Sequence, residues 1–581
     1  MLNSPIVDST EPAPPDATTL SLPTRAAWAI LILATLYLCY FSHLGAIGFV
    51  GPDEPRYAWI ARDIAESGDW VTPRLYGKPW FEKPPLYYWS AAISFKLLGV
   101  SETAARLPSA IAALLATLSL AWLALRLYGA ETARWLLLLL PTSVAMIGFS
   151  HAASTDMLFS STLTAAVVTA AVLLRLLPPN ASVVVAEHAA PVPGTISTPT
   201  VLAALLFGFF LALAVLAKGP AAVVLLGGAV FFWSLFTKRY RDAFRLFHPA
   251  AIATFCLTAL PWYILCARRN PDFFRIFIIE HNFKRYLTPE FQHIQPFWYY
   301  AAVLLIALLP WTALLLWSAV TGAIRLWRTR EINHATLLLL CWSAFCLLFF
   351  SLSKSKLPGY ILPAIPTIAL LSVRGVFILA EKKSKSLPIA ILLAGFLFAA
   401  LYAVVGFFTA TLRGPNFFAA IAVGQIVAGL SAANLVLGTG IWLSAKGKRI
   451  FVAPLVVLPI LLVILVADGL VPAFSIGDPS GKTLSAALRS ENMSDGELAA
   501  AHMRRGLRYS LSFYMHEEVP EWDPAHPHQG LVLVGFERCP LTSPSDFSCD
   551  KRPVELGRTG YFLHRIREKP QALVPDGGKA K

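Results

Sequence analysis

The sequence has little charge for its length. Only 14% of its 581 residues are charged, whereas soluble proteins carry about 25%, and 56% are hydrophobic. This composition excludes an ordinary soluble protein and indicates a polytopic membrane protein. The sequence also lacks zinc-finger spacing, an RNA-binding motif and a P-loop. We therefore expect no nucleic-acid partner, and we interpret the net charge of +14 as basic residues that flank membrane helices on the cytoplasmic side.

Cysteine is scarce, and the chain begins without the marks of a cleaved signal peptide. Five of the seven cysteines lie in apolar runs, where they are inert packing residues. Cys539 and Cys549 lie in a polar region, and the sequence leaves open whether they form a disulfide. Residues 1–24 have neither a basic start nor a short apolar core. We expect a disordered cytoplasmic tail, followed by a first helix that acts as an uncleaved anchor.

Apolar runs dominate the chain from residue 25 to residue 471. A membrane helix needs about twenty such residues, and the sequence predicts about thirteen helices. They lie near 26–48, 104–127, 132–150, 155–177, 200–217, 219–237, 247–267, 297–319, 334–353, 357–379, 387–411, 416–443 and 449–471. The predicted fold is a polytopic α-helical membrane domain over 25–471, with a first periplasmic loop at 49–97 that carries interfacial helices.

Basic residues predict the orientation of these helices. The stretches TKRYRDAFR, RLWRTR, EKKSKS and AKGKR all fall on one predicted side, which we assign to the cytoplasm. An odd number of spans then places residues 472–581 outside the cytoplasm. That region has a soluble composition and contains GLVLVGF, which is typical of a buried strand. We expect a small periplasmic α/β domain there.

Acids and aromatic residues collect in the predicted outer loops. Asp53 follows the first helix, and we interpret it as a functional carboxylate at the membrane boundary. The stretch ARDIAESGDW predicts an amphipathic interfacial helix. Prolines stiffen the turn FEKPPLYYW, so Glu82 and Lys83 are functional candidates, while its aromatic residues suit the headgroup level. Asp156 is either an N-cap or a functional acid.

Cations also gather on this outer side. Lys218, Lys354 and Lys356 occupy turns between apolar helices. A single lysine of this kind is usually a snorkelling anchor, but five more basic residues lie in the loop 268–296: Arg268, Arg269, Arg275, Lys284 and Arg285. Such a cluster at headgroup depth favours binding of a lipid phosphate.

The ordered motifs DEPRYAWIARDIAESGDW, FEKPPLYYW, ETAARLPSA, LAKGP and SLSKSKLPGY resemble those of the bacterial lipid A aminoarabinose transferases. These are membrane glycosyltransferases of the GT-C fold, related to the protein O-mannosyltransferases. The resemblance covers essentially the whole membrane region and is looser in the C-terminal part. It implies transfer of 4-amino-4-deoxy-L-arabinose from undecaprenyl phosphate to a phosphate of lipid A, on the periplasmic face of the bacterial inner membrane, with resistance to polymyxin as a result.

The resemblance also implies a set of site residues. Asp53, Glu82 and Asp156 match catalytic acids, while Lys83, Lys218, Arg285 and Tyr360 match residues that bind the lipid phosphate. Within EHNFKRY, His281 and Arg285 match a histidine and an arginine of a short, variable loop. The expected partners are the lipid-linked sugar donor, the lipid A acceptor and membrane lipids.

Several questions stay open at this point. Fixed cations can stabilise the charge that develops on a leaving phosphate. An ionised phosphate acceptor needs no general base, so Asp53 would orient the acceptor or bind an amino group; a hydroxyl acceptor would need Asp53 as a base. No metal is demanded, but Glu82 and His281 could hold a divalent ion such as zinc. A related transferase with another sugar or a protein acceptor is an alternative, as is a lipid flippase, although no internal repeat is evident.

Overall fold

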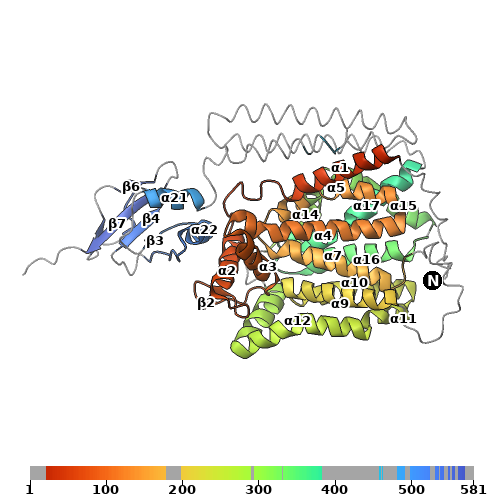
Figure 1. Ribbon diagram of the computed structural model, residues 1–581, viewed down its shortest axis with the longest axis horizontal. Helices are drawn as coiled ribbons and strands as arrows, with labels where there is room; N and C mark the ends of the chain where they lie inside the picture. The colour runs from red at the N-terminus through yellow and green to blue at the C-terminus, as the bar shows by residue number, and fades with distance from the viewer. Residues whose placement is uncertain are drawn as a thin grey trace, which may run out of the picture. The chain divides into compact units, whose positions relative to one another are not determined.

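The structure is a computed structural model of the chain (Figure 1). It describes residues 21–177, 198–288, 294–329 and 331–381, the single positions 457, 458 and 461, and the C-terminal stretches 481–490, 498–523, 530–535, 537–541, 547–549, 553–556 and 561–568. These residues form two compact units. The helical unit comprises residues 1–44, 60–74 and 78–474, and the mixed unit comprises residues 45–59, 75–77 and 475–581.

The helical unit is a bundle of apolar helices. Its elements are α1 (Leu22–Tyr40), α3 (Leu86–Leu98), α4 (Glu102–Tyr128), α5 (Ala130–Leu139), α6 (Val144–Ser150), α7 (Thr155–Leu173), α9 (Thr198–Lys218), α10 (Ala221–Thr237), α11 (Tyr240–Ala243), η1 (Phe244–Phe247), α12 (Pro249–Arg269), η2 (Arg275–Lys284), α13 (Arg285–Leu287), α14 (Tyr299–Ala307), α15 (Thr312–Thr329), α16 (His334–Leu352), η3 (Pro358–Ala364) and α17 (Ile365–Glu381). Helix α2 (Asp53–Ser67) begins in the mixed unit and ends in the helical unit.

Helix α7 lies at the centre of this bundle, between α4 and α9 (Figure 1). Its sequence is rich in Ala, Ser and Thr, which let neighbouring helices approach closely, and nearly all of its residues are buried. Helix α9 packs in turn against α12. A side chain at Gly208 would come within 2.1 Å of the Ala251 carbonyl oxygen, so glycine is required where these two helices cross.

The described residues contain seven helices long and apolar enough to span a membrane, or eight if α5 and α6 form one bent span. These helices identify the chain as a multi-pass membrane protein. The spans predicted at 387–411, 416–443 and 449–471 fall outside the described residues, apart from three isolated positions, as does nearly all of the predicted N-terminal tail. The expected total of about thirteen therefore stays a prediction.

Two of the predicted continuous spans were wrong in detail. The run 132–150 is bent by 63° between α5 and α6, on either side of Pro141. The run 297–319 is divided between α14 and α15 near Pro310. Proline lacks the amide hydrogen that continues an α-helix, which explains breaks at these positions. The predicted span 357–379 is confirmed as Pro358–Ile378, although it begins as the 3-10 helix η3 before α17.

Helix α3 lies almost wholly in the loop 49–97, where interfacial helices were predicted, but its own bounds were not predicted. The aromatic residues of LYYW were expected at the lipid headgroups, but Tyr87 and Tyr88 are fully buried. The Tyr87 hydroxyl donates a hydrogen bond of 2.8 Å to the Ala105 carbonyl of α4. In α2, by contrast, the predicted apolar side is confirmed, because Ile60, Ala61 and Ile64 are all buried.

The described C-terminal part of the mixed unit contains a small sheet and the helices α21 and α22. Strands β3 (Leu498–Ala500), β4 (Gly530–Val534), β7 (Phe562–Glu568) and β5 (Phe547–Cys549) lie in that order, and β6 (Val554–Glu555) also pairs with β7. The pair β3–β4 is parallel, with Ala499 opposite Val532, and β4–β7 is antiparallel, with Val532 opposite His564. The strand predicted from GLVLVGF is confirmed as β4, whose residues from Leu531 to Val534 are buried.

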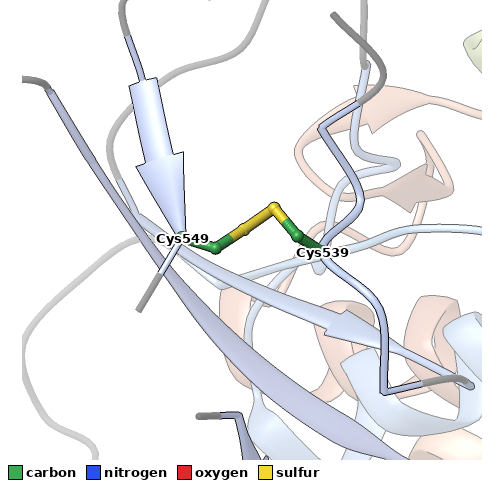
Figure 2. The surroundings of a disulfide bond; sticks show 2 residues. All are labelled: Cys539 and Cys549. Atoms are coloured by element: carbon green, nitrogen blue, oxygen red, sulfur yellow. A yellow bond between two sulfur atoms is a disulfide. The ribbon is translucent and has the colours of Figure 1, made fainter. Parts of the chain in front are cut away.

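Helices α21 (Lys482–Ser490) and α22 (Arg505–Met515) supply the rest of this core. Leu484 and Leu511 pack with Leu531, Leu533 and Leu563 of the sheet. A disulfide joins Cys539 to Cys549 of β5, with Cα atoms 6.1 Å apart (Figure 2). The question that the sequence left open about these two cysteines is thus answered by a bond.

Candidate functional site

Five of the residues singled out from the sequence line one cavity of about 390 Å³ in the helical unit. They are Glu82, Lys83, Lys218, His281 and Tyr360. They come from the segment before α3, the end of α9, the π-helix η2 and the 3-10 helix η3. The volume lies within the range of small-molecule sites in proteins. The cavity therefore brings together segments that are far apart in the sequence.

The turn between α9 and α10 places Lys218. Lys218 is the last residue of α9, Gly219 has a φ of +95°, and Pro220 precedes the first residue of α10. Only glycine adopts that φ readily, and a side chain at Gly219 would lie 2.9 Å from the ring of Phe277. Proline then starts the next helix without needing an amide donor. The LAKGP motif thus fixes the position of the Lys218 backbone at the cavity.

Lys218 forms an ion pair with Asp156 at the start of α7. The side chains are 13% and 24% exposed, respectively, so the pair is largely removed from water. The Lys218 ammonium also lies 4.8 Å from the centre of the Tyr360 ring and 5.5 Å from that of Phe159. Aromatic faces attract cations, so these rings hold the ammonium in place together with the carboxylate.

Glu82 and Lys83 form a second charged pair in the same cavity. The Lys83 ammonium lies 3.4 Å from a Glu82 carboxylate oxygen, and the side chains are 13% and 11% exposed, respectively. The preceding residue, Phe81, is buried in an aromatic cluster, and the centre of its ring lies 5.3 Å from the centre of the Phe273 ring. Burial of Phe81 anchors this segment, so the two charged side chains stand on a fixed backbone.

Two ion pairs place charge at this cavity. Glu82, Lys83 and Lys218 line the cavity, and Asp156 pairs with Lys218. A bound phosphate would compete with the two carboxylates for the ammonium groups. Much of the remaining lining is apolar and includes Val224, Leu287 and Phe349, while Asn282 and Ser353 are polar. A cavity with cations at one part and aliphatic and aromatic walls at another suits a phosphate carried on a hydrocarbon chain.

Asp53 belongs to the mixed unit, where it is the first residue of α2. Its carboxylate pairs with the guanidinium of Arg56, three residues later, while its side chain stays 51% exposed. The Arg56 side chain is only 5% exposed. Sequence reasoning missed Arg56, although an acid and an arginine three residues apart on a helix are a recognisable pairing signal.

The possible metal ligands are not a complete set. Glu82 and His281 both line the cavity. Catalytic zinc sites take three protein ligands, and among the residues that the structure describes no three His, Cys, Asp or Glu side chains are grouped to hold a metal. Glu82 is moreover paired with Lys83. The described residues therefore form no complete metal site, and the metal site predicted at Glu82 and His281 stays an untested prediction.

Several cations of the expected outer cluster are engaged elsewhere. Lys356 is buried, and its ammonium donates to the carbonyls of Ser353 at 2.6 Å and Gln295 at 3.1 Å. Burial, with help from the neighbouring charge of Lys354, lowers the pKa of Lys356. Arg269 pairs with Asp69, and Arg275 pairs with Asp272 and Glu280. The side chain of Arg285 is outside the described part of the chain.

Gly359 makes room for Asp156, which leads to a first prediction. A Cβ atom at Gly359 would lie 2.9 Å from the Asp156 carboxyl carbon and 3.0 Å from the ring of Phe149. We expect Gly359→Ala to displace Asp156 and to lower kcat by roughly ten- to a hundredfold, because small misplacements in a site are costly. The measurement is turnover of the purified protein. Gly322→Ala in α15 is the control, since its Cβ would meet nothing within 4 Å; equal activity of the two variants would contradict the prediction.

The chain is similar to known proteins in sequence. Residues 26–277 match the family described as dolichyl-phosphate-mannose-protein mannosyltransferase. The undecaprenyl phosphate-alpha-4-amino-4-deoxy-L-arabinose arabinosyl transferase of Erwinia tasmaniensis is 33% identical over 366 residues, which are 63% of this chain and 62% of the relative. The transferase of the same name from Edwardsiella ictaluri is 34% identical over 340 residues, or 58% and 57% of the two chains. The chain therefore spans about three fifths of the length of these relatives.

The fold is also similar to a solved structure. ArnT from Cupriavidus metallidurans, solved bound to undecaprenyl phosphate, aligns with a TM-score of 0.74, covering 93% of this chain and 98% of that chain at 20% identity. At that identity the similarity shows a shared fold. The predicted polytopic GT-C fold is confirmed, and so is the resemblance to the aminoarabinose transferases that the motifs indicated.

Proposed function

We propose that this protein transfers 4-amino-4-deoxy-L-arabinose from undecaprenyl phosphate to a phosphate group of lipid A. The observation that carries the proposal is the cavity in which Lys83 and Lys218 stand beside apolar walls. A long-chain phosphate needs both features, since its phosphate seeks cations and its chain seeks apolar surface. Similarity to the arabinosyl transferases supports the choice of sugar.

The leaving group explains the need for fixed cations. Transfer breaks the bond between the sugar's anomeric carbon and the phosphate oxygen of the donor, and both electrons stay with that oxygen. Undecaprenyl phosphate therefore gains one negative charge as it leaves. Lys83 and Lys218, whose side chains are largely buried, stabilise this charge, and the Tyr360 hydroxyl donates a hydrogen bond.

The acids have separate roles. Asp156 and Glu82 hold the two lysines in position until the phosphate arrives. The acceptor phosphate is already ionised at neutral pH, so its oxygen attacks the anomeric carbon without a general base. Asp53 then orients the acceptor or binds the amino group of the sugar. Arg285 is assigned to the donor phosphate by its place in the motif EHNFKRY.

The location follows from the substrates. Lipid A is a lipid of the bacterial cell envelope, and its phosphate is modified after it reaches the periplasmic face of the inner membrane. The proposed active site therefore faces the periplasm. The proposed organisation is a cytoplasmic tail at 1–24, a transmembrane domain at 25–471 and a periplasmic domain at 472–581. A cationic sugar on the phosphate weakens binding of cationic peptides such as polymyxin, which is the expected benefit to the cell.

Mass spectrometry of lipid A tests this function. Lipid A from cells that carry the gene should contain a species heavier by one aminoarabinose per modified phosphate, and cells without the gene should lack it. Cells that carry the Lys218→Met variant serve as a control for expression of an inactive protein. Unmodified lipid A in all three strains would contradict the proposal; another sugar mass, or a glycosylated protein, would favour a related GT-C transferase.

A further inference from the structure

The mixed unit joins two parts of the chain through contacts between residues 461 and 465 positions apart. It combines residues 45–59, which carry Asp53, with the C-terminal residues 475–581. The element of the C-terminal part that meets the first loop is helix α22. Its side chains contact residues that precede Asp53 in the sequence and residues that follow it.

Phe49 is the main contact before Asp53. Its side chain is fully buried, and its ring lies 4.7 Å from that of Phe513, edge to face, and 6.0 Å from that of Tyr514. The Phe49 amide donates to the Tyr514 hydroxyl at 3.0 Å, and the Ser510 hydroxyl donates to the Phe49 carbonyl at 3.0 Å. Two side chains of α22 thus satisfy both backbone polar groups of one loop residue, which is unusually specific for a loop.

The backbones also approach each other closely two residues before Asp53. A Cβ atom at Gly506 would lie 2.8 Å from the carbonyl carbon of Gly51. After Asp53, the guanidinium of Arg56 lies 5.6 Å from the centre of the Tyr509 ring of α22. The same guanidinium binds the Pro52 carbonyl at 2.9 Å through its Nε and pairs with Asp53.

A hydrogen bond within the loop also stabilises the segment that carries Asp53. The Val50 amide donates to the Glu54 carboxylate at 2.9 Å, so Glu54 closes the turn that precedes α2. Asp53 lies within this turn, yet its side chain remains 51% exposed. A side chain that stays exposed on a backbone held from both sides is available to a substrate at a defined position.

We infer that helix α22 positions Asp53 for transfer, with Ser510 and Tyr514 as positioning residues that act through the backbone of Phe49. The inference rests on the proposed role of Asp53. It gives the C-terminal part of the chain a function in the reaction that is separate from any substrate contact of its own. Loss of the two hydroxyl groups should loosen the segment 49–53. It also removes the bond of 2.7 Å that the Gly481 amide donates to the Ser510 hydroxyl, but the leucine core of the mixed unit should stay in place.

The test uses the full-length protein with Ser510→Ala and Tyr514→Phe combined. Ser485→Ala in α21 is the matched control, because Ser485 is also buried and its hydroxyl bonds only within its own helix, to Lys482. We expect the double variant to lower kcat roughly ten- to a hundredfold with little change in the KM of the donor. Ser485→Ala should keep the wild-type kcat.

A double-mutant cycle separates positioning from general damage. If α22 acts through Asp53, adding the two substitutions to Asp53→Asn should cause no further loss of activity, since the group being positioned is already gone. An additive loss would overturn the inference, and so would a double variant with wild-type kcat.

Hydrogen exchange distinguishes failure of this inference from failure of the proposed function. In the double variant, amides of residues 49–56 should exchange faster while those of β4 and β7 stay protected. Unchanged exchange at 49–56 would overturn the inference whatever the enzyme does. If the wild-type protein transfers no sugar, the proposed function fails, and the exchange result still decides whether α22 holds the segment.

Discussion

A Lys218→Met variant is expected to transfer sugar roughly a hundred- to a thousandfold more slowly than the wild-type protein. The substitution removes the charge of a side chain that is 13% exposed and lines the cavity, and a preorganised charge of this kind is worth about 3–4 kcal/mol to a transition state. Methionine keeps most of the aliphatic volume, so the packing against Phe159 and Tyr360 is retained. The measurement is kcat in detergent with the lipid-linked donor.

The partner of this lysine provides the cross-check. Asp156→Asn should lower kcat less, because the ammonium stays in the cavity, and the double variant should be no worse than Lys218→Met alone. Lys238→Met, at the far end of α10 on an exposed position, should behave as wild type. If Lys218→Met lowers the melting temperature but leaves kcat of the folded protein unchanged, the ion pair serves stability only.

Lys83→Ala is expected to cost roughly ten- to a hundredfold in donor affinity or turnover. The reason is the loss of a charge-assisted hydrogen bond to phosphate, worth about 1.5–3 kcal/mol in a partly buried site. The chain offers a matched control in the same loop, since Lys78 lies five residues earlier and is exposed. Lys78→Ala should change the kinetics by no more than about fivefold, as exposed lysines usually do.

The readout for this pair is the KM of the donor together with kcat, on protein whose folding is checked by thermal melting. Glu82→Gln should raise donor affinity slightly or leave it unchanged, because it frees the Lys83 ammonium from a competing carboxylate. Equal losses for Lys83→Ala and Lys78→Ala would mean that a diffuse surface charge, and not this cavity, attracts the donor phosphate.

Short-range features of this protein could be predicted from its sequence. The strand β4 follows from a run of apolar residues bounded by glycines, and the turn at Lys218 follows from its glycine and proline. The breaks near Pro141 and Pro310 could also have been predicted from the sequence, because proline lacks the amide hydrogen that an α-helix needs. Such features depend on a few neighbouring residues.

Pairings across the fold could not be predicted in the same way. Lys218 and Asp156 are 62 positions apart, and Ser510 reaches a carbonyl 461 positions away. The expected cluster of outer cations shows the limit most clearly: Lys356 sits in a lysine-rich stretch, yet its ammonium is buried against backbone carbonyls. A sequence gives the type of charge, whereas its partner depends on which distant segments pack together.

The most direct test of the whole account is transfer by the purified protein. The protein in detergent is supplied with undecaprenyl-phosphate-linked 4-amino-4-deoxy-L-arabinose and lipid A, and the products are analysed by mass spectrometry. The account predicts lipid A carrying aminoarabinose on a phosphate, one undecaprenyl phosphate released for each sugar transferred, and loss of both products with Lys218→Met. Unchanged donor and acceptor with well-folded wild-type protein, or release of undecaprenyl phosphate without sugar on lipid A, would contradict it.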